Sequence, residues 1–266
     1  MLHALRCIIK PAGDKMSDQV RRSITCTVTS MLGHPDDSCR VVAAACLGTL
    51  CEFLPNDEFE DIVRENLLED DPSVDWVLRH GRSVALMVAL KETPSRMLNE
   101  DWTDRIVKVL LVYLTADRLA IVLSGVRATG YYIVHKLQEG EQLPQPLLTT
   151  FSKSMNHNTN EVKQAVALTI NFLARKQNLP LHVMKTFVPH LVNGTKEKNT
   201  IVKSNSEFAL VAVLNLRKGD ETAQVCLNAL DAGAREALQD VITKVLKKVA
   251  SQPEPKEEEL DDTLLT

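Results

Sequence analysis

Aromatic residues are scarce in this sequence and make up only 4% of its 266 residues. A β-sandwich or β-propeller of this size relies on Tyr, Phe and Trp for its strands, so their scarcity argues against both folds. Ala, Leu and Val fill the apolar positions instead, which is typical of helices. The composition therefore favours an all-α protein.

Long apolar runs are also missing. No stretch reaches the roughly 18 apolar residues of a transmembrane helix, and residues 1–6 lack the apolar core of a signal peptide. The six cysteines include no Cys-x-x-Cys pair, so we expect reduced thiols in a reducing compartment. These observations predict a cytoplasmic protein with no membrane partner.

The usual catalytic and cofactor-binding motifs are absent as well. The sequence has no P-loop, no Gly-x-Ser-x-Gly turn, no His-Glu-x-x-His and no Cys/His cluster with zinc spacing. Cys46 has apolar neighbours, Ala45 and Leu47, and no adjacent base to activate it. We therefore predict that the protein is not an enzyme and that it uses no cofactor, no metal and no small-molecule substrate.

The charge is unevenly distributed. There are 31 basic and 35 acidic residues, a formal charge of −4 that excludes a globally basic nucleic-acid binder. Residues 253–262 contain six acids and one lysine. Such a segment buries too little apolar surface to fold, so we predict an acidic disordered tail at residues 251–266. It would serve as a solubilising end or, alternatively, as a docking or autoinhibitory segment.

An internal repeat is the main signal in the sequence. Five segments share a turn, a basic or apolar marker residue and then an apolar helix, and their markers are Arg40, Arg82, Leu123, Lys163 and Lys203. The markers are separated by 42, 41, 40 and 40 residues. After each marker, apolar residues recur at the i, i+3, i+4, i+7 spacing of one helix face. A constant period of this length indicates a repeat protein.

A second amphipathic run precedes each marked helix, at residues 20–32, 59–68, 106–114, 147–155 and 183–192. Most prolines fall between the expected helices, and only Pro189 lies inside one. We therefore predict a HEAT-type α-solenoid, a right-handed superhelix of antiparallel helix pairs. It would span residues 1–250 with about six pairs. Residues 1–10 form half a repeat, which suggests that the chain starts inside a longer solenoid.

Solenoids bind partners through extended surfaces, and the second helices of HEAT repeats line the concave face. Arg40, Arg82, Lys163 and Lys203 would then form a basic ladder, interrupted at Leu123, for an acidic peptide or a phosphate backbone. The alternative is structural: these cations pair with acids of the turns, such as Asp36 and Asp71, and hold the repeats in register.

Aromatic residues at helix starts are further candidates. Trp76 and Trp102 begin helices, where Trp is either an interaction hot spot or packing between repeats, and we select Trp76 as a candidate partner-binding residue. Tyr131 and Tyr132 are adjacent, so we expect only one of them to face the core. The polar connection at residues 193–200 is either a partner contact or a plain solvated turn.

Three strings carry a family resemblance: DWVLRHGRSVAL at residues 75–86, CRVVAAACLG at 39–48 and EEELDDTLLT at 257–266. They resemble the C-terminal HEAT-repeat segment of the giant stalled-ribosome sensors, which activate the kinase of translation initiation factor two alpha. The resemblance extends over the whole chain.

The resemblance implies a non-enzymatic scaffold in general amino-acid control and the integrated stress response. The implied partners are the starvation-response kinase, recruited through its RWD domain, and the ribosome or ribosome-associated proteins, with a possible rRNA contact. The alternative is a HEAT-repeat scaffold from another pathway, such as transport or phosphatase assembly.

Overall fold

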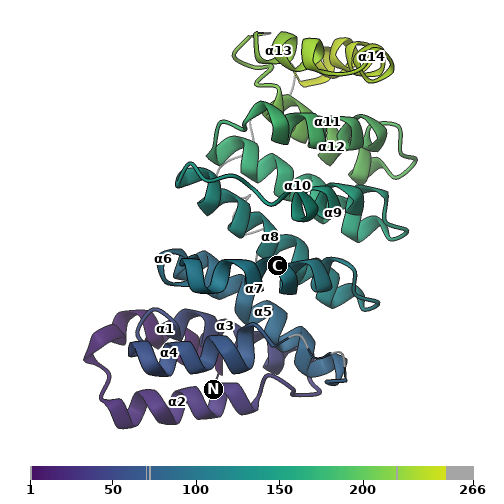
Figure 1. The fold of residues 1–266 in the computed structure, drawn as a ribbon. Coiled ribbons are helices and arrows are strands. Elements are labelled where there is room, and N and C mark those ends of the chain that lie inside the picture. The colour runs from purple at the N-terminus through teal and green to yellow at the C-terminus, as the bar shows by residue number, and fades with distance from the viewer. Residues whose placement is uncertain (1, 70, 72, 220, 250–266) are drawn as a thin grey trace. The chain divides into compact units, whose positions relative to one another are not determined.

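The computed structural model describes residues 2–69, 71, 73–219 and 221–249, and every regular element in that part of the chain is a helix (Figure 1). The all-α prediction is confirmed. The chain divides into two compact units, unit 1 at Met1–His135 and unit 2 at Lys136–Thr266. The predicted tail at residues 251–266 lies outside the described residues.

Unit 1 contains a leading helix followed by successive helix pairs. The helices are α1 (Leu2–Ala12), α2 (Asp18–Ser30), α3 (Asp37–Leu50), α4 (Asn56–Ile62), α5 (Trp76–Glu92), α6 (Pro94–Met97), α7 (Glu100–Leu114) and α8 (Leu119–Gln138), of which residues 136–138 belong to unit 2. A 3-10 turn follows α1 at Gly13–Lys15, and α4 continues as a π-helical turn at Val63–Leu67. Helix α3 packs against α1, α2 and α5, so each repeat is covered by its neighbours.

Unit 2 has the same organisation. Its helices are α9 (Gln145–Lys153), α10 (Asn160–Lys176), α11 (Leu181–Gly194), α12 (Thr200–Val213), α13 (Glu221–Ala229) and α14 (Ala232–Val249), with a 3-10 turn at Ser154–Asn156 after α9. Helix α12 packs against α10 and α11, and α11 also contacts α13 and α14.

Several helices begin before the apolar runs that predicted them, because a polar residue caps each start. Ser17 Oγ accepts the Val20 N–H ahead of α2, and Asn99 Oδ1 accepts the Trp102 N–H ahead of α7. Asn199 does the same for α12. An apolar run marks the buried stripe of a helix, whereas its capping residue sets where the helix begins.

The second helices of unit 1 form its core. Every residue from 42 to 51 is buried, as is every residue from 83 to 90. These two stretches contain small residues because α3 and α5 approach closely. A Cβ on Gly48 would lie 2.6 Å from Val88 Cβ, and a Cβ on Gly81 would lie 2.1 Å from the carbonyl oxygen of Leu32. The scarcity of aromatic residues follows from this close packing.

Two expectations from the sequence are wrong. Pro11 lies inside α1, next to its last residue, and Pro94 and Pro146 lie in the first turns of α6 and α9, where proline is tolerated because the N–H would have no helical partner. Tyr131 and Tyr132 are both buried, at 3% and 1% exposure. Helix α8 is covered on more than one side, with Lys91 of α5 over the Tyr131 ring and Tyr113 of α7 against Gly125. Pro189 lies inside α11, as predicted.

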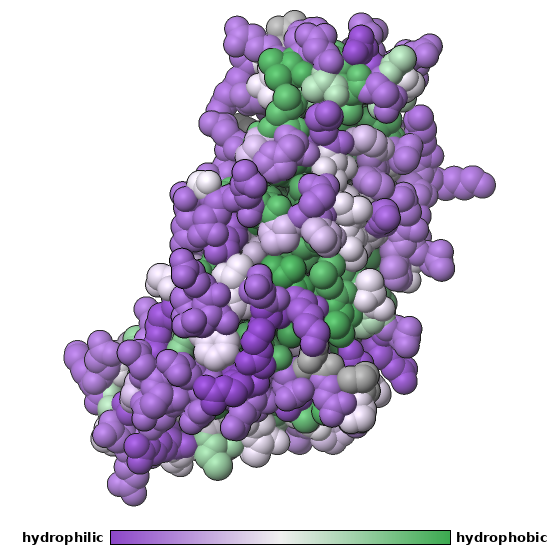
Figure 2. Space-filling model, in the orientation of Figure 1, coloured by the Kyte–Doolittle hydropathy of each residue, from purple (hydrophilic) through white to green (hydrophobic). Residues whose placement is uncertain are grey.

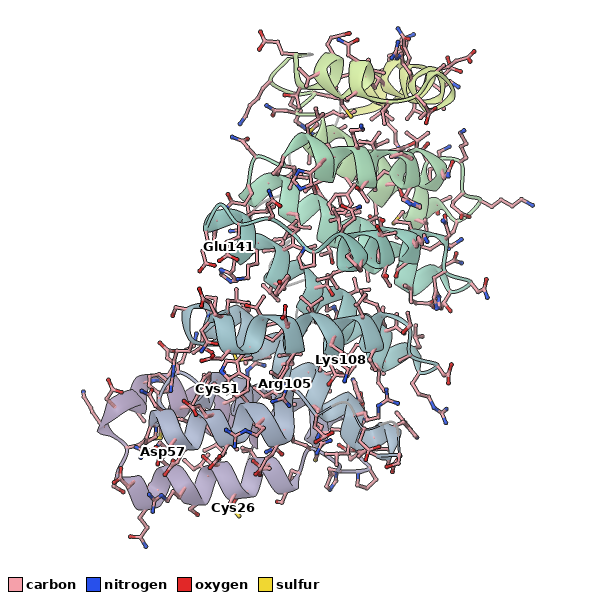
Figure 3. All side chains as sticks on the ribbon, in the orientation of Figure 1. Cys26, Cys51, Asp57, Arg105, Lys108 and Glu141 are labelled. Carbon is pink, nitrogen blue, oxygen red and sulfur yellow. The ribbon has the colours of Figure 1, made fainter. Side chains whose placement is uncertain are left out.

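All six cysteines are free thiols. Figure 3 shows Cys26 on the outer side of α2 and Cys51 among the helices. Burial raises the pKa of Cys46 to about 11 and that of Cys51 to about 12, so both stay protonated and unreactive at neutral pH.

No helix in the described part of the chain is both long and apolar enough to cross a membrane.

Gly81 provides a test of the close packing in unit 1. Gly81→Ala should lower the free energy of unfolding by about 1–3 kcal/mol, because the new methyl group meets the backbone of Leu32. Gly33→Ala is the matched control, since its Cβ would lie 3.6 Å from Leu78 Cβ in ordinary contact. Urea denaturation of both variants checks this, and equal stabilities would contradict the packing argument.

Candidate interaction site

The structure places Arg40 and Arg82 in unit 1 and Lys163 and Lys203 in unit 2. It brings Arg40 and Trp76 together, and it gives each of the four cations a different environment. The four cations therefore do not form one uniform basic ladder.

Arg40 is a buried connector between consecutive repeats. Its side chain is 3% exposed, and its Nη1 donates to the carbonyl oxygen of His34 at 2.7 Å. Its Nε donates to His80 Nδ1 at 3.1 Å, and its Nη2 pairs with Asp37. These bonds tie the turn before α3 to helix α5. They match the structural role that the sequence left open as the alternative for this residue.

Trp76, the first residue of α5, is 38% exposed. The Arg40 Cζ lies 5.8 Å from the centroid of its ring, and the Arg118 Cζ lies 5.0 Å from it. Arg118 is exposed in the turn before α8, and the next residue, Leu119, is 39% exposed. We call Trp76, Arg118 and Leu119 the Trp76 cluster, an exposed aromatic and cationic surface above the buried Arg40.

Arg118 was not predicted, because the marker position of its repeat holds Leu123 and not a cation. The signal was nevertheless present. Arg118 comes 118 − 76 = 42 residues after Trp76, which is one repeat length. Equivalent turns of neighbouring repeats lie side by side in a solenoid, so this spacing predicts contact.

His80 lies beneath the same surface in α5. Burial lowers its pKa first, and the Arg40 guanidinium lowers it further, while Asp37 opposes this shift. A neutral ring is consistent with the hydrogen bond, because Nδ1 must be unprotonated to accept from Arg40.

Arg82 makes a weaker connection. Its Nη2 donates to the carbonyl oxygen of Glu65 at 3.2 Å, while its Nε and Nη1 are buried with no hydrogen-bond partner among the described residues. Asp71, which the sequence suggested as its partner, directs its carboxylate to the Ser73 N–H at 2.8 Å. That bond lowers the Asp71 pKa most, and the charge of Arg82 lowers it to a smaller extent.

In unit 2, Lys163 repeats the role of Arg40. Its Nζ lies 2.6 Å from Glu197 Oε1, so α10 is joined to the loop that precedes α12. Lys203 lies in the first turn of α12 and is exposed, next to the exposed Ile201. Of the four cations, Arg40 is buried, Arg82 and Lys163 are partly exposed, and Lys203 is exposed.

The other sequence candidates divide between core and surface. Trp102 is only 7% exposed, with the Arg105 Cζ 5.7 Å from its ring centroid. In the connection at residues 193–200, Thr195 is buried, whereas Lys196 and Lys198 are exposed.

One group of potential metal ligands comes together among the described residues: His34, Asp36 and Cys39, whose ligand atoms lie within 4.8 Å of one another. Asp36 Oδ1 accepts the Cys39 N–H at 2.8 Å, and His34 Nδ1 accepts the Asp36 N–H at 3.1 Å. These atoms therefore form the turn that starts α3. The sequence analysis missed the group because it searched for zinc spacing alone.

Figure 2 shows mostly hydrophilic side chains on the face in view, with hydrophobic residues visible between them, including near α13 and α14. The exposed large apolar residues of that helix pair are Val225 and Leu246.

Comparisons with known proteins identify relatives along the whole chain. A family model described as stalled ribosome sensor GCN1-like, HEAT repeats, matches residues 1–264. The human stalled ribosome sensor GCN1 is 37% identical over 270 residues, which cover 100% of this chain and 10% of the human protein. The eIF-2-alpha kinase activator GCN1 of Saccharomyces cerevisiae is 28% identical over 142 residues, covering 53% of this chain and 5% of the yeast protein.

A solved structure of an engineered protein matches with a TM-score of 0.51 at 15% identity, covering 94% of this chain and 98% of that one. This likeness concerns the fold alone. The chain spans about a tenth of the length of the human relative. Together with the family model, the helix pairs confirm the predicted HEAT-type solenoid.

The buried position of Arg40 generates a prediction. Arg40→Ala should lower the free energy of unfolding by about 2–4 kcal/mol, because charge-assisted hydrogen bonds and side-chain packing are lost together. Lys203→Ala, at the equivalent but exposed marker, should change it by less than about 0.5 kcal/mol. Denaturation curves measure both, and a comparable loss in the two variants would refute the connector role of Arg40.

His80 gives a pH dependence. Its folded pKa is lower than the ordinary value of 6.5, so the unfolded chain takes up the proton first as the pH falls. Its contribution to stability is complete above pH 6.5 and is lost as the pH drops below that value. His80→Gln should therefore flatten the loss of stability between about pH 7 and pH 5.

The matched control for this prediction is His182→Gln, at an exposed position of α11. It should leave the pH profile unchanged. Part of the pH dependence should survive in His80→Gln, because burial and Lys153 lower the pKa of His190. Identical profiles for His80→Gln and the wild type would contradict the assignment.

Proposed function

Because this chain belongs to the stalled ribosome sensor GCN1-like HEAT-repeat family, we propose that it is a non-enzymatic scaffold segment of translational control. In this proposal it supports ribosome-associated activation of the kinase of initiation factor two alpha, in the cytoplasm, during amino-acid starvation or ribosome stalling. The observation that carries the proposal is the match of residues 1–264 to the family.

The names of the relatives link two properties. The human relative is named a stalled ribosome sensor, and the yeast relative is named an activator of the eIF-2-alpha kinase. A protein with both properties has to connect a ribosome to a kinase. Stacked helix pairs suit that task, because a solenoid offers a long surface that holds several partners at once.

The Trp76 cluster is the contact surface that we propose in unit 1. Trp and Arg are enriched among the residues that dominate binding energy, and Trp76 and Arg118 supply both on one exposed surface. The buried Arg40 approaches the same ring and holds it in place from the side of the core. In unit 2, we propose that the exposed Lys203 and Ile201 form the corresponding contact surface.

In this proposal Arg40 and Lys163 support the binding surface indirectly. Their bonds to His80 and Glu197 position the turns of consecutive repeats, so they shape a partner site without touching the partner. Arg82 has the same positioning role in this proposal, because it donates a hydrogen bond to the carbonyl oxygen of Glu65.

Two binding assays with the whole chain test the proposal. The tagged chain should co-sediment with ribosomes through a sucrose cushion, and it should retain the RWD domain of the kinase in a pull-down. A folded chain that enters neither complex would refute direct recruitment through this segment.

A charge reversal then tests the Trp76 cluster. Arg118→Glu should reduce recovery of at least one partner about tenfold, because it replaces the cation over the exposed indole with an anion. Arg105→Glu on α7 is the matched control: Arg105 is also exposed and also lies over a Trp ring, but that ring is buried. Equal effects of the two variants would exclude the cluster as the contact.

A further inference from the structure

Unit 2 contains a cavity of about 910 Å³ where α10 and α12 end. It is lined by residues near the ends of these two helices, by residues 177–179, 215, 217 and 218 of the connections that follow them, and by single residues of α11 and α13. Its volume lies near the upper end of the roughly 300–1,000 Å³ that is usual for ligand sites. It is separate from the Trp76 cluster, which belongs to unit 1.

The lining of this cavity has one sign of charge. Arg175, Lys176, Arg217 and Lys218 all contribute, and none of the lining residues is Asp or Glu. A concave surface lined by cations concentrates the positive potential within it. The expected occupant is therefore an anion.

The four cations come from two places in the chain. Arg175 and Lys176 occupy the last turn of α10, where a positive charge offsets the partial negative charge of the helix end. Arg217 and Lys218 instead come after α12, whose last residue is Val213. They lie beyond the terminal turn in which the helix dipole acts.

The backbone after α12 explains how Arg217 and Lys218 reach the cavity. Asn215 takes a left-handed conformation with φ 52°, the Leu216 N–H bonds to the Val211 carbonyl at 3.0 Å, and the Asn215 N–H bonds to the Ala212 carbonyl at 3.1 Å. This is a Schellman cap, which reverses the chain at the end of a helix. The reversal brings the two following cations into the lining.

The neutral part of the lining narrows the class of anion. Phe208 is partly exposed there and offers an aromatic face, and the side-chain amides of Gln177, Asn178 and Asn215 can both donate and accept hydrogen bonds. Cations together with an aromatic surface are the combination that binds single-stranded nucleic acid, through its phosphates and a stacked base. Side-chain amides can hydrogen-bond to base edges, and a partly exposed aromatic ring gives a base a surface on which to stack.

We propose that this cavity binds single-stranded RNA, with Arg175, Lys176, Arg217 and Lys218 on the phosphates and Phe208 against a base. An unpaired strand can turn its bases outward to stack on an aromatic ring, whereas the bases of a duplex are stacked on one another. The inference rests on the proposed function, because a ribosome-associated segment meets unpaired rRNA. Beyond that function, it names the binding site on this chain and specifies that the RNA is single-stranded.

The test is fluorescence anisotropy of a labelled oligouridine with the whole chain at several salt concentrations. The wild type should bind the oligonucleotide, and Arg217→Glu with Lys218→Glu should weaken binding at least tenfold. Replacing the same pair by Gln should make the slope of log affinity against log salt shallower by about 1.4, since each phosphate contact contributes about 0.7 for single strands. Both residues are exposed, so the fold should survive.

Lys196→Glu with Lys198→Glu is the matched control, because it changes the charge equally at exposed residues of unit 2 outside the cavity. This control should retain most of the binding. Phe208→Leu should weaken binding severalfold without changing the salt slope, since it removes the stacking surface and no charge.

Three results would overturn the proposal. They are no binding of oligouridine by the wild type, an equal loss in the control and cavity variants, and binding of a labelled oligoglutamate in place of RNA. Ribosome co-sedimentation is measured separately. Oligouridine binding by a chain that neither co-sediments with ribosomes nor retains the RWD domain refutes the proposed function alone. Co-sedimentation without oligouridine binding refutes the cavity assignment alone.

Discussion

The structure depends on one constraint: a helix pair of about 40 residues cannot bury its apolar face by itself, so each pair needs a neighbour. In unit 1 this requirement makes α3 a core helix, packed against α1, α2 and α5 and buried at every position from 42 to 51. Close packing of this kind selects small residues. A methyl group at Gly48 would meet α5, and one at Gly81 would meet the backbone of Leu32, which follows α2.

The same stacking places polar groups between repeats, where they must find partners within the protein. Arg40 does so through His34, Asp37 and His80, and Lys163 does so through Glu197. These cations act as connectors because the turn of one repeat lies against the helix of the next. At Lys203, by contrast, the marker side chain is exposed.

Much of the fold was predictable because it is periodic. The spacing of 40–42 residues predicted the repeats, and the apolar i, i+3, i+4, i+7 pattern predicted the helices within them. Both signals are regular along the sequence and need no knowledge of tertiary contacts. The candidate site was predictable only in part. Arg40 and Trp76 were selected, but their contact was not, and Arg118 was missed because its neighbour lies a full repeat away. The two tyrosines of α8 were misjudged because a solenoid helix is covered on more than one side.

The sequence by itself determined the class of the protein: its helical composition, its repeat period and the strings that mark its family. Only the tertiary structure decided what each charged residue does. Arg40 and Lys203 hold the same place in the repeat, yet one is buried in a hydrogen-bond network and the other is exposed. The cavity at the ends of α10 and α12 is likewise invisible in sequence, because its four cations come from two consecutive repeats. The physical reason is that burial and charge pairing depend on neighbours that stacking brings together from distant parts of the chain.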